Sequence, residues 1–262
     1  MKTKWYALGS LASLLLFPFP GSAQTVSVSV PGTSNPYLAG MPNGSVAAPD
    51  QAPYQSPVEV VGLDLSVGGA VSFTGARGGV SNVPFCAGTN CSSIDGNVYQ
   101  GRLFYDHDHA AQNGMSDIKA PINSLVGVFL SDTLPNLSPP PPKLDFQAIG
   151  LDFASLAPDI QQVFFIGDGR TSGGVIQQFA IPGSATRLFL GTMDGVEWLN
   201  NSGVITLNVS QVVPEPETYA MFCAGLILLG WVAKRRRTGR AGAPVSYPSR
   251  QLCARIRPPS RQ

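Results

Sequence analysis

The chain has 262 residues and a formal net charge of +1, with 13% charged residues, 29 glycines and 23 prolines. Once targeting segments at the two ends are set aside, this length suffices for one domain with a proper core. The composition is typical of an extracellular all-β domain with many turns, and no basic patch with interleaved aromatic residues predicts binding to nucleic acid.

The first 23 residues have the pattern of a secretory signal peptide. Lys2 and Lys4 precede an apolar stretch from Trp5 to Phe19, and small residues follow up to Ala23. We expect a signal peptidase to cut after Ala23. The competing interpretation is a second membrane helix, but the apolar run is short and its small-residue end suits the peptidase. The chain is therefore predicted to be exported.

Residues 24–57 form a Pro- and Ser-rich segment with one alternating stretch, Thr25–Val30, and the β-domain is predicted over residues 58–212. Its expected strands are short, rich in β-branched or aromatic residues, and bounded by Gly, Pro, Asn or Asp. No segment between them has an apolar face at helical spacing. The pattern predicts a jelly-roll-like β-sandwich. The expected strands are Val58–Leu65, Ala70–Phe73, Arg102–Tyr105, Leu125–Leu130, Gln162–Ile166, Val175–Ile181, Arg187–Leu190 and Val204–Val209.

Two of the four cysteines lie in the predicted domain, where Cys86 and Cys91 are five positions apart. Outside the cytoplasm such a pair most often closes a small loop as a disulfide. The alternative is half of a zinc site, but no second Cys/His pair at ligand spacing follows.

The chain shows no sequence motif of a known catalytic site. It contains neither G-x-S-x-G nor H-E-x-x-H. The Gly-rich run from Ile166 to Gly173 has the wrong spacing for a dinucleotide fingerprint, and a predicted strand follows it, so we interpret it as a hairpin turn. A carboxylate pair for glycoside cleavage has no local signature and is not tested by the sequence. We therefore predict a protein that is not an enzyme.

Two other places carry residues suited to binding. Residues 106–109 read Asp-His-Asp-His and contain both histidines of the chain, with Gln112 shortly after; the plain interpretation is a hydrated loop. Further on, a predicted strand ends near Asp194, and Asn200 and Asn201 close the following loop. Asp and Asn oxygens with backbone carbonyls form the ligand set that calcium prefers. The alternative is a hairpin loop capped by Asx turns.

Four short motifs give residues 58–209 a resemblance to the small calcium-dependent, galactose-binding lectins of bacteria, a jelly-roll family. They are residues 69–73, 109–112 and 125–129 and the loop from Asp194 to Gly203. The resemblance implies calcium held by the side chains of Asp194, Asn200 and Asn201, by the carbonyl of Phe73 and by one near Glu197. It also implies a galactose-like sugar, or an extracellular polysaccharide, touched by His109 and Gln112. Trp198 is a candidate to stack on a face of that sugar.

The C-terminal region has three parts in sequence. The motif Val213-Pro214-Glu215-Pro216 comes first, an uncharged apolar run from Thr218 to Ala233 follows, and the basic cluster Lys234-Arg235-Arg236-Arg237 comes last. Hydropathy predicts a transmembrane helix with the basic cluster on the cytoplasmic side, and by itself it favours a plain C-terminal anchor.

The order of these parts, over residues 213–237, resembles the PEP-CTERM sorting signal of Gram-negative bacteria. The resemblance implies a membrane exosortase as partner, transient anchoring in the inner membrane by the helix, and delivery to the cell surface or extracellular matrix. Residues 238–262 are basic and Pro/Ser-rich and are interpreted as a disordered tail, either a cytoplasmic extension or the product of a lost stop codon.

The sequence thus predicts an exported, exosortase-sorted protein with a calcium-dependent, lectin-like domain that binds carbohydrate in exopolysaccharide or biofilm. The alternative is a structural or adhesive envelope protein without a small-molecule ligand.

Overall fold

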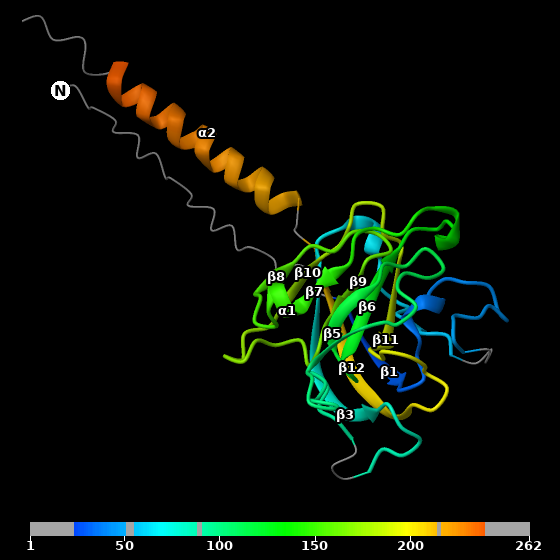
Figure 1. Cartoon of the computed structure of the whole chain (residues 1–262). Helices are drawn as coiled ribbons and strands as arrows, with labels where there is room; N and C mark the ends of the chain where they lie inside the picture. The colour runs from blue at the N-terminus through cyan, green and yellow to red at the C-terminus, as the bar shows by residue number, and fades with distance from the viewer. Residues whose placement is uncertain (1–23, 51–54, 88–90, 214–215, 239–262) are drawn as a thin grey trace, which may run out of the picture. The chain divides into compact units, whose positions relative to one another are not determined.

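The structure, a computed structural model, describes residues 24–50, 55–87, 91–213 and 216–238 (Figure 1). The predicted signal peptide and residues 239–262 of the predicted tail lie outside the described residues. The chain divides into two compact units, residues 1–214 and residues 215–262. Each unit is described by itself below.

The described part of the first unit is rich in β-structure and confirms the all-β prediction. Its helical segments are short: α1 (Phe146–Ile149) and the 3-10 turns at Pro36–Leu38, Leu65–Val67 and Pro135–Leu137. Its strands are β1 (Gln24–Pro31), β2 (Val58–Glu59), β3 (Ala70–Ser81), β4 (Phe104–Asp106), β5 (Ile118–Pro121), β6 (Leu125–Leu130), β7 (Leu144–Asp145), β8 (Ser155–Leu156), β9 (Val163–Phe165), β10 (Gln178–Ala180), β11 (Arg187–Thr192) and β12 (Ser202–Val212).

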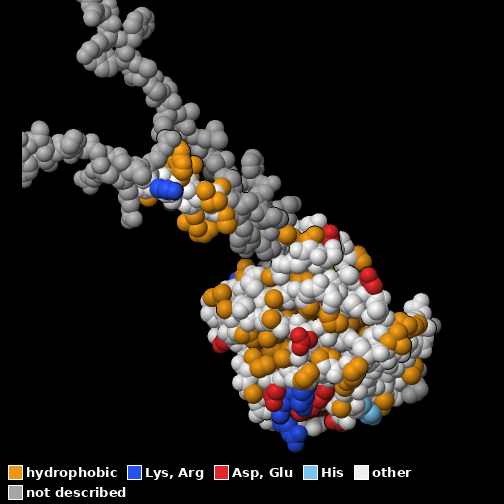
Figure 2. All heavy atoms as spheres, turned by 90° about the horizontal axis from the view of Figure 1, so that it is seen from above, with side chains coloured by type: hydrophobic (Ala, Val, Ile, Leu, Met, Phe, Trp, Pro, Cys, Tyr) orange, Lys and Arg blue, Asp and Glu red, His pale blue; other side chains and the backbone are white. Residues whose placement is uncertain are grey.

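The described strands form three sheets. The five-stranded sheet has the order β1-β12-β3-β10-β8, the four-stranded sheet β2-β11-β6-β9, and the three-stranded sheet β4-β5-β7. A jelly roll is built from eight strands in two sheets, so this arrangement does not confirm the finer prediction. Charged side chains are few on the face of the molecule shown in Figure 2, in keeping with the low content of charged residues.

The five-stranded and four-stranded sheets share one apolar core. Phe179 of β10 and Phe164 of β9 come from different sheets, and their ring centroids are 5.3 Å apart. In β12 the residues alternate as a two-sided strand requires: Ile205, Leu207 and Val209 are buried, while the residues between them are half-buried or exposed. Strand β6 is buried along its whole length, which explains why its sequence is a continuous apolar run.

Strand β3 is longer than the predicted segment because it continues through glycines that ordinarily weaken a strand. Gly78 has a φ of 93°, and a Cβ at this position would lie 2.2 Å from the carbonyl oxygen of Val204 on β12. Only glycine allows the two backbones to approach this closely. The glycines between Thr74 and Ser81 therefore extend β3 along β12 instead of ending it.

The second unit contains one described helix, α2 (Pro216–Thr238), whose described side chains from Phe222 to Lys234 are exposed. No helix among the described residues is long and apolar enough to cross a membrane. The prediction of a transmembrane helix over Tyr219–Ala233 is therefore corrected. Its uncharged run has about 16 residues, or about 24 Å of helix, whereas a bilayer core is about 30 Å thick.

Candidate functional site

The residues predicted to bind calcium lie in the connection between β11 and β12, here called the Asp194 loop (residues 194–201). β11 ends at Thr192, and Met193 is fully buried, so the loop starts from the core. The backbone N–H of Val196 donates to Asp194 Oδ1 at 2.9 Å, which is the Asx turn that such residues favour. The loop closes where the N–H of Asn201 donates to the Trp198 carbonyl at 3.1 Å.

The Asp194 loop is fixed from behind by Trp198 and Asp50. Trp198 is 0% exposed, and its indole N–H donates to the Thr192 carbonyl at 2.9 Å. The buried Asp50 carboxylate accepts the backbone N–H groups of Trp198 and Leu199 at 2.7 and 3.2 Å. The proposal that Trp198 stacks on a sugar is therefore wrong, because no face of its ring reaches solvent. Trp198 supports the loop from the core instead.

Three side-chain oxygens of the loop are buried and have no hydrogen-bond donor among the described residues: Asp194 Oδ2, Asn200 Oδ1 and Asn201 Oδ1. The nitrogens of the same two amides are used. Asn200 Nδ2 donates to Glu197 Oε1 at 2.7 Å, and Asn201 Nδ2 donates to the Gly32 carbonyl at 3.3 Å. These bonds leave the amide oxygens as the open acceptors of both side chains. Buried acceptors of this kind are rare without a partner.

Asp194 is a buried carboxylate. Asp194 is 4% exposed. Burial raises the pKa of its carboxyl to about 6, although the hydrogen bond from the Val196 N–H acts in the opposite direction. A nearby cation would favour the ionised form and lower this pKa. The carboxylate and the two amide oxygens match the hard-oxygen chemistry of calcium, so these ligand types fit that ion. Asp194 and Asn200 line the cavity beside the loop, whereas Asn201 does not.

The remaining predicted ligands are placed less favourably. Phe73 lies within β3, is fully buried and pairs with Val209; it does not line the cavity beside the Asp194 loop. The half-buried Glu197 does line it, and one of its carboxylate oxygens accepts from Asn200. The described residues include no group of three or more His, Cys, Asp and Glu side chains suited to a metal ion. Any metal site here therefore depends on amide and carbonyl oxygens.

The two residues predicted to contact the sugar lie in different surroundings: His109 is exposed, and Gln112 is already hydrogen-bonded within the protein. His109 is exposed, and its ring centroid is 5.6 Å from that of His107. Gln112 is occupied, because its amide accepts the Ala48 N–H at 2.7 Å and donates to the Ala48 carbonyl at 2.9 Å. The Gln112 amide nitrogen is also 2.7 Å from His107 Nε2. Gln112 thus holds the segment around Ala48, a role that the sequence did not indicate.

His107 connects this network to the Asp194 loop. Its ring is buried, and Nδ1 lies 3.2 Å from the Gly195 carbonyl oxygen. Since that carbonyl only accepts, Nδ1 carries the proton, and Nε2 accepts from the Gln112 amide. This tautomer is the neutral ring. Burial accordingly lowers the pKa of His107.

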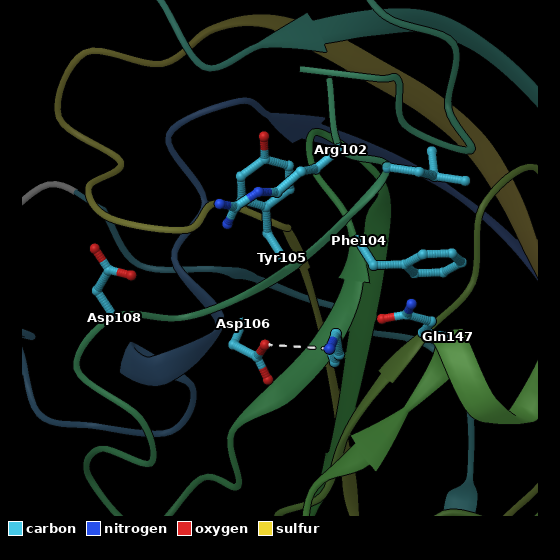
Figure 3. A pocket seen from close by; sticks show the side chains of 8 residues that line it. Arg102, Phe104, Tyr105, Asp106, Asp108 and Gln147 are labelled. Atoms are coloured by element: carbon cyan, nitrogen blue, oxygen red, sulfur yellow. Dashed lines mark ion pairs between the residues drawn. The ribbon is translucent and has the colours of Figure 1, made fainter. Parts of the chain in front are cut away.

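A cavity of about 390 Å³ lies beside the Asp194 loop. One side of it is made by the loop itself, through Asp194, Gly195, Val196, Glu197 and Asn200. The other side comes from distant parts of the chain: Asn82, Tyr99, Gln100, Arg102, Tyr105, Asp108 and Ile122. A second cavity, also of about 390 Å³, shares Arg102, Tyr105 and Asp108 with the first (Figure 3).

The residues from Tyr99 to Tyr105 were not predicted as part of a site. Gln100 and Gly101 both have positive φ, 46° and 77°, between the bridged residues Tyr99 and Arg102. Positive φ at both central positions is the signature of a tight hairpin turn. The residue pair Gln100-Gly101, between Tyr99 and Arg102, is the feature of the sequence that could have predicted this turn.

The predicted cysteine pair and the Gly-rich turn also lie in described parts of the structure. Cys86 and Cys91 are joined in a disulfide, with their Cα atoms 4.6 Å apart. The Gly-rich run forms the turn expected of it: an antiparallel bridge joins Arg170 to Ile176, and the Thr171 N–H donates to the Val175 carbonyl at 2.9 Å.

Comparison with known protein families identifies the C-terminal region. Residues 212–237 match the family described as the PEP-CTERM protein-sorting motif. The chain therefore carries the signal of an exosortase-sorted, exported surface protein, and the signal implies a sorting step at a membrane. Neither the curated proteins nor the solved structures gave a match.

Proposed function

We propose that this exported chain is a non-catalytic, calcium-dependent carbohydrate-binding protein. It acts at the surface or in the extracellular matrix of a Gram-negative bacterium, in exopolysaccharide or biofilm. The observation that carries the proposal is that three buried side-chain oxygens of the loop, on Asp194, Asn200 and Asn201, have no hydrogen-bond partner among the described residues. A folded protein ordinarily gives such atoms a donor or a cation.

In this proposal Asp194, Asn200 and Asn201 hold calcium, and Glu197 lies beside them. The ion, when bound, supplies positive charge and coordination positions for pairs of sugar hydroxyls. The protein positions the ion-binding loop and supplies further contacts to the sugar. Trp198 and Asp50 keep the loop in place from behind. The exposed His109 is the available imidazole for a hydrogen bond to the sugar, whereas Gln112 is held by Ala48.

The second candidate function is a structural or adhesive envelope protein whose β-domain binds no small ligand. The engagement of Gln112 with Ala48 favours this alternative, because the resemblance to the lectins implied a sugar contact at that position. The two functions differ in their response to calcium.

The decisive measurement is thermal unfolding of the purified domain with calcium and with a chelator. A ligand that binds only the folded state stabilises it, by about 2.7 kcal/mol at a hundredfold excess over the dissociation constant. We expect a higher melting temperature with calcium, and Asp194→Ala should remove the difference. Asp168→Ala, in an Asp-containing turn elsewhere in the domain, is the matched control and should keep it. An absence of any calcium shift, together with no retention on galactose or matrix polysaccharide, leaves the structural function.

Sorting is tested separately in the native cell. Deletion of Pro214–Pro216 should block processing by the exosortase, so that the mature protein keeps a higher intact mass and does not reach the surface. The control is deletion of Val245–Tyr247, a segment of the same length that lies C-terminal to the whole sorting signal. Unchanged surface delivery, with a mature mass equal to that of the undeleted protein, after the first deletion would show that the PEP-CTERM motif does not direct sorting of this chain.

A further inference from the structure

The cavity wall opposite the Asp194 loop carries a preorganised arginine. In the Tyr99–Arg102 hairpin, the Tyr99 N–H donates to the Arg102 carbonyl at 2.8 Å and the Arg102 N–H donates to the Tyr99 carbonyl at 2.9 Å. The hydroxyl of Tyr105 also donates to the Tyr99 carbonyl, so the hairpin is tied to β4. The base of the Arg102 side chain is thereby fixed. A long cationic side chain loses less entropy on binding when its backbone is already ordered.

The Arg102 guanidinium has no hydrogen bond or ion pair with any residue that the structure describes. The two lysines near it are engaged: Lys119 lies 3.7 Å from Asp106 and Lys143 lies 3.4 Å from Asp117. Figure 3 shows the Asp106–Lys119 pair as a dashed line, while Arg102 extends toward the side of the pocket where Asp108 lies. Arg102 is therefore the cation of this region that remains available to a ligand.

The charges that line the first cavity do not balance without a further cation. Arg102 faces three carboxylates there, those of Asp108, Asp194 and Glu197. A divalent cation at the Asp194 loop would bring the formal charge of the lining to zero. Arg102 would then no longer be required to neutralise the loop, and its planar fork matches the geometry of a carboxylate.

The two cavities form one binding region around a common wall. Each has a volume of about 390 Å³, and both are lined by Arg102, Tyr105 and Asp108. The Tyr99 and Tyr105 rings, with centroids 6.2 Å apart, are half-buried and supply apolar surface next to Arg102. A ligand that is bound on both sides of this wall must be longer than one sugar unit.

We propose that the ligand is an acidic polysaccharide segment of at least two linked sugars, and that Arg102 binds its carboxylate while the Asp194 loop binds its hydroxyls. This inference rests on the proposed calcium-dependent sugar binding and adds the class of sugar. Arg102 is then the residue that determines specificity for acidic over neutral chains.

The test compares two disaccharides of similar shape, digalacturonic acid and galactobiose, by isothermal titration of the exported domain in excess calcium. We expect the acidic disaccharide to bind at least tenfold more tightly. Arg102→Gln should remove this preference by weakening the acidic disaccharide at least tenfold relative to galactobiose. Arg77→Gln, an exposed arginine on β3, is the matched control and should retain the preference. Raised salt should weaken the acidic ligand more than the neutral one.

The outcomes separate this inference from the function on which it rests. Equal affinities for the two disaccharides, with the calcium shift in melting temperature intact, would overturn the acidic specificity alone. A preference for the acid that persists in Arg102→Gln would overturn the role of Arg102. If calcium neither stabilises the domain nor supports binding of either sugar, the proposed function fails first.

Discussion

Two eight-residue loops of the domain each contain one aspartate, and they differ in how their polar side chains are satisfied by hydrogen bonds. The Asp194 loop follows β11, and the turn at residues 167–174, here called the Asp168 loop, follows β9. In the Asp168 loop the carboxylate of Asp168 accepts the Arg170 N–H at 2.8 Å. Asp152, which lies beside the loop, accepts the N–H and the hydroxyl of Ser172 at 2.6 and 2.8 Å. In the Asp194 loop three buried side-chain oxygens have no donor in the part of the chain that the structure describes.

The difference shows that an aspartate in a polar loop does not by itself define a binding loop. The Asp168 loop lies beside a cavity of about 480 Å³ that includes Asp95, Asp152 and Asp168. Its polar groups satisfy one another, so it needs no ligand to be complete. The Asp194 loop is held by a buried aromatic ring and a buried carboxylate, and this support lets it keep acceptors that it does not use. The variants predicted below remove the groups that hold the Asp194 loop one at a time.

The largest expected effect comes from truncation of Trp198. Removing its fully buried ring leaves a cavity, and Trp198→Ala should lower the free energy of unfolding by about 3–5 kcal/mol. Ile176→Ala, beside the Asp168 loop, removes a partly exposed side chain and should cost less than about 1 kcal/mol. Urea unfolding of both variants measures the contrast. Equal losses would mean that the two loops are anchored alike.

A smaller effect is expected from Asp50. Its carboxylate accepts two backbone N–H groups, at Trp198 and Leu199. Asp50→Ala leaves the buried Trp198 N–H and the part-buried Leu199 N–H without this acceptor. The loss should be about 2–3 kcal/mol, and the calcium response should weaken because the loop is no longer fixed. Asp152→Ala, beside the Asp168 loop, should cost less, since Asp152 is exposed and solvent can replace the lost bonds. Urea unfolding at pH 7 checks both, and a larger loss for Asp152→Ala would contradict the comparison.

The smallest expected effect is a pH dependence that originates at His107. Its pKa is lowered in the folded state from the ordinary 6.5, chiefly by burial, so the fold favours the neutral ring. The contribution of His107 to stability is therefore complete above pH 6.5 and is lost as the pH falls below that value. Protonated Nε2 would face the Gln112 amide as a second donor, at a cost of about 1 kcal/mol for the lost hydrogen bond.

Melting temperatures at pH 7.5 and pH 5.5 measure this effect. The wild type should lose more stability on acidification than His107→Gln, while the exposed His109→Gln should behave as the wild type. Asp117 lies near His107 and opposes the shift, whereas His109 adds to it. If His107→Gln shows the same acid loss as the wild type, the ring is not the titrating group.

Much of the β-structure could be predicted from the sequence where strands carry their own apolar pattern. Leu125–Leu130 has the predicted bounds, and the strands near Arg187 and Val204 extend beyond them. The β5, β7 and β8 strands were missed, because two-residue or proline-containing segments carry too little periodicity. The strand predicted over Val58–Leu65 is observed only at Val58–Glu59. At the other end of the predicted segment, a 3-10 turn capped by Asp64 begins at Leu65.

Of the two walls of the candidate site, only the one formed by the Asp194 loop could be predicted from the sequence. Asp194, Asn200 and Asn201 lie close together in sequence, so a loop pattern could bring them together. Asp50 and Arg102 reach the site from separate segments of the chain, and nothing in their neighbourhoods indicates that tertiary contact. Trp198 was assigned to the surface because an aromatic residue in a polar loop resembles a stacking platform, yet the sequence does not reveal which side of the loop is buried.

The pairing of β1 with β12 has a consequence for export. These strands pair along all of β1, from Gln24 opposite Gln211 to Pro31 opposite Val204, and β12 is the neighbour of β1 in its sheet. A chain that crosses the membrane with its N-terminus first must therefore wait, with β1 unpaired, until nearly the whole domain has emerged. Closing so large a loop is slow. During that interval the alternating serines of β1 keep one of its faces polar, which limits association with other chains before its partner strand arrives.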